Sequence, residues 1–111
     1  VLNVRPRFDL LTTLPGRGVI ISARGDSTDI VSRFFAPKYG ISEDPVTGSA
    51  HCTLTPYWCD RLDTNRISAR QISARIGSII CELRKDRVLL SGHAVLILEG
   101  VMYYGQHQAK N

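Results

Sequence analysis

The chain contains the stretch Glu43-Asp44-Pro45-Val46-Thr47-Gly48-Ser49-Ala50-His51-Cys52, which joins two adjacent carboxylates to a Gly-Ser turn that opens into a predicted helix. The first backbone N–H groups of a helix have no partner within it, and the helix dipole adds partial positive charge at the same end. Small anions bind at such ends. Glycine at position 48 leaves the approach clear of a side chain. The stretch therefore predicts an anion site at a helix start.

The helix itself is predicted from about Ser49 to Leu62. Apolar residues recur there at the spacing of a single helical face, at Ala50, Leu54, Tyr57 or Trp58, and Leu62. Tyr57 and Trp58 are expected to anchor the core. Pro56 lies inside the segment, where it removes a hydrogen bond to the carbonyl of Cys52, so we expect a bend.

The remainder of the chain is predicted to be mostly extended, apart from a helical turn or two within residues 7–14. Val- and Ile-rich segments bounded by turn residues predict strands at 18–24, 29–36, 66–73, 78–84, 87–91 and 94–104, with Gly100 interrupting the last. One helix against many strands is an α+β arrangement. With no linker, repeat or low-complexity segment, residues 1–111 are expected to form one domain.

Composition excludes several classes of protein. The 111 residues are 43% hydrophobic and 22% charged, as in ordinary globular domains. No apolar run approaches the roughly 20 residues that cross a bilayer, and the chain does not open like a secretory signal, so we expect a cytoplasmic location and no membrane partner. The net charge is +4, but the arginines are scattered singly, which favours a solvated surface over a nucleic-acid footprint. The excess could assist capture of an anionic metabolite.

The three cysteines, Cys52, Cys59 and Cys81, are an odd number without close-paired metal spacing. Cys52 and Cys59 on one helix would stand about 10 Å apart, beyond disulfide reach. Free thiols are the expected state. A zinc site that adds His51 and His93 is the disfavoured alternative.

Residues 43–58 closely resemble the signature of the phenazine-biosynthesis PhzF family, whose members share the diaminopimelate epimerase-like fold. Residues 16–21, 32–37 and 87–100 also resemble the C-terminal half of that family. The resemblance implies a single lobe: a curved, mostly antiparallel or mixed sheet wrapped around one central helix. A family member is normally more than twice as long and has two lobes with the active site between them. The other lobe, which carries the family's principal catalytic glutamate, has no counterpart in this chain.

Asp44 matches an aspartate that lines the active site in the PhzF family, and it precedes a proline that favours extended backbone. The resemblance thus implies a catalytic role. The alternative from the residues alone is that Asp44 or Glu43 solvates a loop and complements the helix dipole. His51, in the first helical turn, is a secondary catalytic candidate, and a packed or surface histidine is an equal alternative.

The turn after Asp44 matches the family's cradle for a substrate carboxylate, which consists of Thr47, Gly48, Ser49 and Ala50. Backbone N–H groups and the serine hydroxyl would be the donors. The plainer alternative is that Thr47 or Ser49 only caps the helix. The two roles can coexist.

The resemblance implies an isomerase that needs no cofactor and no metal, and that shifts a proton between carbons near the carboxylate of a small cyclic or amino acid substrate. Three hypotheses address the missing lobe. A homodimer could complete the site, with the strand at 94–104 exchanged between subunits. The protein could instead bind small carboxylates without catalysis. Finally, it could be an isolated domain of a longer enzyme, which valine at position 1 favours.

Overall fold

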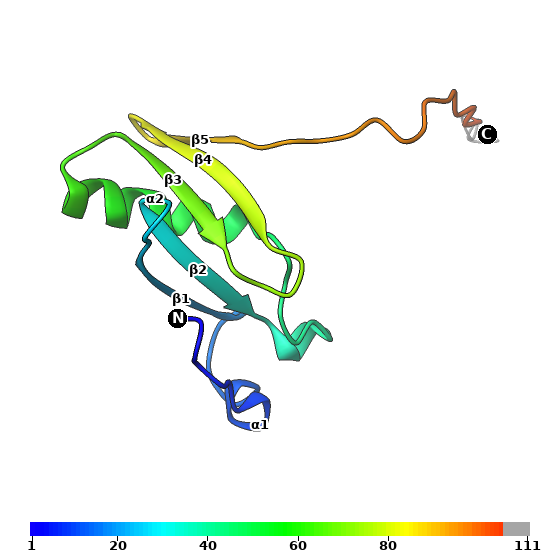
Figure 1. Ribbon diagram of the computed structural model, residues 1–111. Coiled ribbons are helices and arrows are strands. Elements are labelled where there is room, and N and C mark those ends of the chain that lie inside the picture. Colours follow the sequence, from blue (N-terminus) through cyan, green and yellow to red (C-terminus); the bar gives the residue numbers. More distant parts are fainter. Residues whose placement is uncertain (106–111) are drawn as a thin grey trace, which may run out of the picture.

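The computed structural model describes residues 1–105. The order of elements is α1 (Phe8–Leu11), β1 (Val19–Arg24), β2 (Ile30–Phe35), a 3₁₀ turn (Pro37–Tyr39), α2 (Gly48–Leu62), β3 (Arg66–Gln71), β4 (Gly77–Arg84) and β5 (Arg87–Ser91). Figure 1 shows one long helix against a curved sheet. The predicted α+β class, with a mixed sheet and one main helix, is confirmed.

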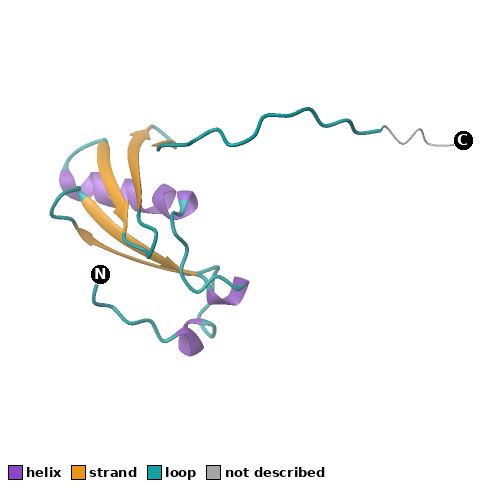
Figure 2. Cartoon of the chain, turned by 45° about the vertical axis from the view of Figure 1, so that its right-hand side comes forward, coloured by secondary structure: helices purple, strands orange, loops and turns teal. Residues whose placement is uncertain are grey.

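The sheet has the strand order β1-β2-β3-β4-β5, with antiparallel neighbours except for the parallel pair β2 and β3. Parallel strands need a crossover connection, and α2 supplies it. Figure 2 shows α2 lying along one face of the sheet. Because the sheet does not close on itself, β1 and β5 are its edges.

The core lies between α2 and that face of the sheet. Strand β3 buries every second residue, as expected for a strand with one face against a core. The buried cluster consists of Ile30, Leu54, Cys59, Ile67, Ala69, Ile79 and Cys81. Each fully buried aliphatic side chain contributes about 1.5–3 kcal/mol, so this cluster holds α2 on the sheet.

Helix α2 matches its predicted boundaries and continues through Pro56, which lies on its exposed side. It ends at Leu62, and the next residue, Asp63, adopts a left-handed conformation with φ of 50° at the C-cap. Trp58 packs against the core and donates its indole N–H to the hydroxyl of Ser22 at 3.0 Å. The expectation that Tyr57 anchors the core is wrong: its side chain is 48% exposed and lies under the guanidinium of Arg61.

The predicted strand at 94–104 is wrong for the chain by itself. Residues 92–105 have no regular secondary structure and all of them are exposed. In Figure 1 this segment leaves the end of β5 and runs away from the sheet. A strand requires a hydrogen-bonded neighbour, and β-propensity alone does not supply one. The radius of gyration, 18.1 Å, accordingly exceeds the roughly 13 Å of a compact chain of this size.

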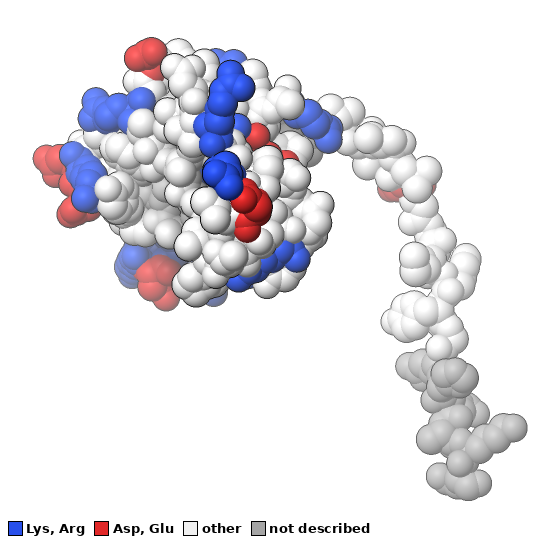
Figure 3. All heavy atoms as spheres, turned by 90° about the horizontal axis from the view of Figure 1, so that it is seen from below, with Lys and Arg blue, Asp and Glu red and all other residues white. Residues whose placement is uncertain are grey.

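Among the described residues, no helix is long and apolar enough to cross a membrane. On the face shown in Figure 3, basic side chains are distributed around the molecule, with a short run of them across the middle, and several lie beside acidic ones. The segment that leaves the sheet is mostly uncharged in the same view.

Candidate functional site

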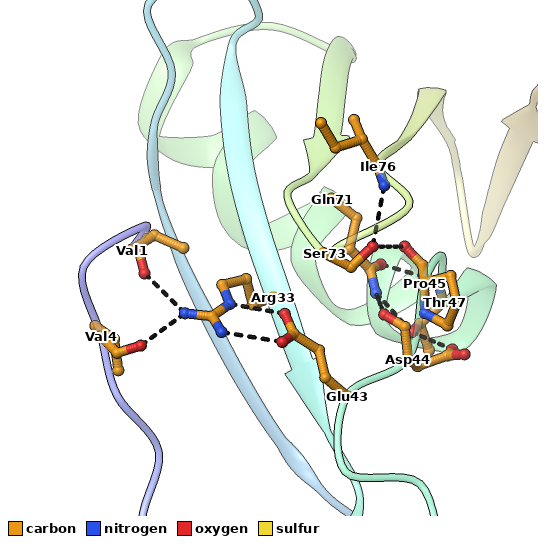
Figure 4. A network of polar contacts seen from close by, with 10 residues as sticks. All are labelled: Val1, Val4, Arg33, Glu43, Asp44, Pro45, Thr47, Gln71, Ser73 and Ile76. Atoms are coloured by element: carbon orange, nitrogen blue, oxygen red, sulfur yellow. Dashed lines mark hydrogen bonds and ion pairs between the residues drawn. The ribbon is translucent and has the colours of Figure 1, made fainter.

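The loop that leads into α2 is held by one buried amide side chain, Gln71, at the end of β3. Its carbonyl oxygen accepts the backbone N–H of Thr47 at 2.8 Å. Its amide nitrogen donates to the backbone carbonyl of Asp44 at 2.7 Å and to the Thr47 hydroxyl at 3.0 Å. Figure 4 shows Gln71 directed at this loop. Three hydrogen bonds from one buried residue fix the loop's position relative to the sheet.

Asp44 is the half-buried carboxylate of this loop. Its Oδ2 accepts the Thr47 hydroxyl at 2.5 Å, and its backbone N–H donates to the carbonyl of Phe34 at 3.0 Å. Among the hydrogen bonds of residues 1–105, none involves Oδ1. One oxygen of the carboxylate is therefore held in place while the other can face a ligand.

Further contacts keep the loop rigid. The Ser73 hydroxyl donates to the carbonyl of Pro45 at 2.9 Å and accepts the Ile76 N–H at 3.2 Å (Figure 4). Gly77 lies against Val46, where an added Cβ would come within 1.8 Å of a methyl carbon. The loop is thus packed and hydrogen-bonded along most of its length.

Glu43, the neighbouring carboxylate, has a structural partner. Arg33 donates to it in a fork at 2.7 and 2.9 Å, and this pairing raises the pKa of the guanidinium. The same guanidinium donates to the carbonyls of Val4 at 2.7 Å and Val1 at 3.3 Å (Figure 4). A forked arginine–carboxylate pair is geometrically specific, so Glu43 ties the N-terminal segment to β2 and the loop.

The start of α2 has no side-chain cap from the part of the chain that the structure describes. Thr47 occupies the cap position with extended backbone (φ −118°, ψ 104°), but its hydroxyl donates to Asp44 instead of capping the helix. The hydrogen bonds of residues 1–105 include no side-chain partner for the N–H groups of Gly48 and Ser49. Both residues are exposed. Thr47 thus occupies the cap position, as the plainer alternative expected, but among residues 1–105 neither Thr47 nor Ser49 caps the helix through its side chain.

A cavity of about 490 Å³ opens in front of this helix start. Its lining consists of Arg17, Phe34, Ala36, Tyr39, Ile41, Asp44, Val46, Thr47, Gly48 and Ser49. Four of the predicted site residues, Asp44, Thr47, Gly48 and Ser49, thus lie together. Ala50 is 3% exposed and does not line the cavity, so only its backbone could take part.

His51 lies beneath the helix start, fully buried and outside the cavity lining. Its Nδ1 is 2.7 Å from the carbonyl of Thr47, which can only accept, so Nδ1 carries the hydrogen. Nε2 is then an acceptor for the Ser32 hydroxyl at 3.5 Å. Burial lowers the pKa of His51. The structure therefore keeps His51 out of the cavity and makes it a neutral support for the backbone of Thr47.

Two residues of this site were not predicted from the sequence. Gln71 lies 24 positions after Thr47, and a lone glutamine in a strand carries no local signal of such a contact. Arg17 lies within the stretch 16–21 that resembles the PhzF family, but neither that resemblance nor its place among the scattered arginines assigns it a role in the site. A signal for Arg17 existed in the two glycines that flank it, which indicate a tightly constrained turn.

The state of the three cysteines bears on whether the site could bind a metal ion. All three cysteines are free, as predicted, with Cys52 exposed and Cys59 and Cys81 buried. Burial raises the pKa of both buried thiols. Within residues 1–105, no group of three or more His, Cys, Asp or Glu side chains is placed to hold a metal ion.

The fold and site define a lobe of α+β structure with a cavity at the start of its central helix. The family model PhzC-PhzF, described as phenazine biosynthesis-like protein, matches residues 1–100. The chain therefore belongs to the PhzC/PhzF phenazine biosynthesis-like family.

Individual relatives agree with this assignment. An uncharacterized isomerase of Pseudomonas aeruginosa is 56% identical over 96 residues, covering 86% of this chain and 37% of the relative. A phenazine biosynthesis-like domain-containing protein of Bos taurus is 40% identical, covering 91% and 38%.

A crystal structure of a putative PhzC/PhzF phenazine biosynthesis protein from Clostridium difficile superposes with a TM-score of 0.82 at 45% identity, covering 94% of this chain and 40% of that one. The chain thus spans about two fifths of the length of these relatives, as expected for a single lobe.

Proposed function

We propose that this chain is one lobe of a cofactor-independent isomerase that shifts a proton near the carboxylate of a small cyclic or amino acid. The observation that carries the proposal is the cavity that Gly48 and Ser49, at the start of α2, line together with the half-buried Asp44. The names of several bacterial relatives, each an uncharacterized isomerase, support the reaction class.

The chemistry follows from what each group can do. Amides at the helix start would hold the substrate carboxylate, because the dipole and the unpaired N–H groups favour negative charge there. Asp44 would then move a proton at a neighbouring carbon. One carbon loses a proton to a base, another carbon of the same molecule gains one from an acid, and no electrons leave the substrate. His51, which is buried, would act by holding the Thr47 carbonyl.

A second lobe is part of the proposal, and we place it in a second copy of this chain. Eight large apolar side chains in residues 95–104 are 77 to 93% exposed, and they need cover in water. The open edge strand β1 adjoins a groove of about 480 Å³ lined by Ile20, Ile21, Ser22, Thr53, Leu54 and Tyr57. An extended peptide can add to such an edge by main-chain hydrogen bonds. Residues 94–98 of the partner would fit there, since they are uncharged and about as long as β1.

Deuterium incorporation tests the isomerase. The protein is incubated in heavy water with a panel of cyclic dienoic acids and amino acids, and carbon-bound deuterium is followed by NMR. We expect incorporation into at least one compound, and loss of at least 100-fold in rate for Asp44→Asn, since positioned acid–base groups contribute about 10²–10⁴-fold. Asp26→Asn, at an exposed turn, is the matched control and should retain the wild-type rate.

A second candidate function is a small-carboxylate-binding protein without catalysis. It is favoured by the cavity lining, in which Asp44 is the one carboxylate among the described residues, while Glu43 is engaged by Arg33. Binding without deuterium uptake in any compound would favour this candidate. Uptake that appears only when the protein is part of a longer polypeptide would favour the isolated-domain hypothesis.

A further inference from the structure

Arg17 lies at the cavity and has no hydrogen-bond or ion-pair partner among residues 1–105. It lines the same cavity as Asp44, Gly48 and Ser49, and it is exposed. The ion pairs among residues 1–105 use other arginines, namely Arg7, Arg33 and Arg84. A guanidinium carries five N–H donors in a fixed fork, so the donors of Arg17 remain for a ligand.

The backbone around Arg17 is fixed by the glycines on either side. Gly16 has φ of 94°, in the left-handed region that favours glycine. Gly18 lies so close to β2 that an added Cβ would be 2.6 Å from the carbonyl oxygen of Phe35 and 2.7 Å from the Phe34 ring. Phe34 itself lines the cavity. The backbone position of Arg17 is therefore set by the close packing of Gly18 and by the left-handed conformation of Gly16.

The balance of charges in the cavity indicates the role of Arg17. Asp44 repels a ligand carboxylate, and the partial charge of a helix start, roughly half an elementary charge, offsets that repulsion only in part. In the described lining of the cavity, Arg17 is the other charged residue, and its sign is positive. A full positive charge at the rim balances Asp44 and leaves the helix amides free to attract the ligand.

We propose that Arg17 is a substrate-binding residue that pairs with an acidic group of the ligand and makes the cavity selective for carboxylates over neutral molecules of the same shape. This inference rests on the proposed function, because it assumes that the cavity takes a small carboxylate. It adds the residue that sets charge selectivity.

The test is an NMR titration of the ¹⁵N-labelled protein with benzoate as the probe and benzamide as its uncharged analogue. The affinity is read from the backbone amides of Gly48 and Ser49, and contact with Arg17 from its side-chain Nε–Hε signal. In the wild-type protein, benzoate should move all three signals, and benzamide should bind more weakly. An exposed ion pair contributes up to about 1 kcal/mol, so Arg17→Gln should weaken benzoate binding about fivefold and leave benzamide binding unchanged.

Two further variants serve as controls for the charge of Arg17 and for its place at the cavity. Arg17→Lys retains the charge but not the fork, and should lose less affinity than Arg17→Gln. Arg75→Gln removes an exposed arginine that does not line the cavity, and should bind like the wild type. The ¹⁵N spectrum of each variant shows whether it folds.

The outcomes distinguish a failure of the role given to Arg17 from a failure of the proposed function. In one outcome, benzoate shifts the Gly48 and Ser49 signals of the wild-type protein and leaves the Arg17 signal unmoved; in another, folded Arg17→Gln binds benzoate as tightly as the wild type. Either result overturns the role of Arg17 and leaves the proposed function standing. Absence of benzoate shifts at Gly48 and Ser49 overturns both. An equal loss for benzoate and benzamide in Arg17→Gln would show a structural role and would also overturn the inference.

Discussion

Gln71 shows how one residue can determine the shape of the site without touching a ligand. It is 1% exposed and contributes both ends of its amide to the loop that carries Asp44. A buried donor or acceptor left without a partner costs about 1–3 kcal/mol. The site therefore depends on a side chain in β3 as much as on the loop's own sequence.

Replacing Gln71 tests this dependence. Gln71→Leu removes three hydrogen bonds and leaves the Thr47 N–H unpaired, so the free energy of unfolding should fall by about 2 kcal/mol or more in urea denaturation. Gln71→Glu keeps an acceptor for Thr47 but loses the two donated bonds, and it should fall between the wild type and Gln71→Leu near neutral pH. Faster hydrogen exchange at the Thr47 amide is expected in Gln71→Leu. Unchanged exchange and stability would contradict the role given to Gln71.

His51 predicts a specific pH dependence of stability. Its pKa in the folded protein is lowered by burial from 6.5, so the unfolded chain binds a proton more readily. As pH falls below about 6.5, the free energy of unfolding should fall, by up to about 1.4 kcal/mol per pH unit, until the folded-state pKa is reached.

The matched variant for this prediction is His51→Gln, in which the loss between about pH 6.5 and 5 should disappear even if the variant is less stable overall. Asp29 does not interfere, since hydrogen bonds from Ser68 lower its pKa below 3.8 and its contribution is lost only at more acidic pH. A flat wild-type profile from pH 7 to about 5 would contradict the buried neutral state of His51.

At the scale of elements, α2 and its entry loop are the parts that the sequence predicts best. Helix boundaries, capping position and the cluster around Asp44 depend on residues close in the chain. The sheet order and the Gln71 contact depend on residues that meet only after folding, and no local pattern encodes them. The segment 94–104 has strand-like composition, but a strand exists only with a neighbour, which one chain does not provide.

Two glycines at the element junctions should respond oppositely to the same substitution. An added Cβ at Gly77 would lie 1.8 Å from Val46, so Gly77→Ala must displace the loop and should destabilise the protein by about 1–3 kcal/mol. At Gly48 the same methyl would meet Leu90 at 3.6 Å, an ordinary contact. Because glycine disfavours helix, Gly48→Ala should be neutral or more stable by up to about 1 kcal/mol. Thermal denaturation of the pair checks this, and equal losses would contradict the packing described here.

At the scale of the whole molecule, the proposed homodimer predicts the mass of the protein in solution. Light scattering after size-exclusion chromatography should give twice the 12.3 kDa of one chain. Leu96→Lys with Leu98→Lys places charges in the segment proposed to cross between copies, and the mass should fall toward that of the monomer. Leu2→Lys, at another exposed apolar residue, is the control and should leave the dimer intact. A wild-type monomer at high concentration would contradict the homodimer and favour a second lobe from elsewhere.

The central claim is that a small carboxylate binds in front of the first amides of α2, beside Asp44. The most direct measurement is the position of that carboxylate, determined from a crystal of the protein grown with benzoate. We predict a carboxylate group within hydrogen-bond distance of the Gly48 and Ser49 N–H groups. A helix start occupied by a side chain of the protein itself, with benzoate absent or bound elsewhere, would contradict the account.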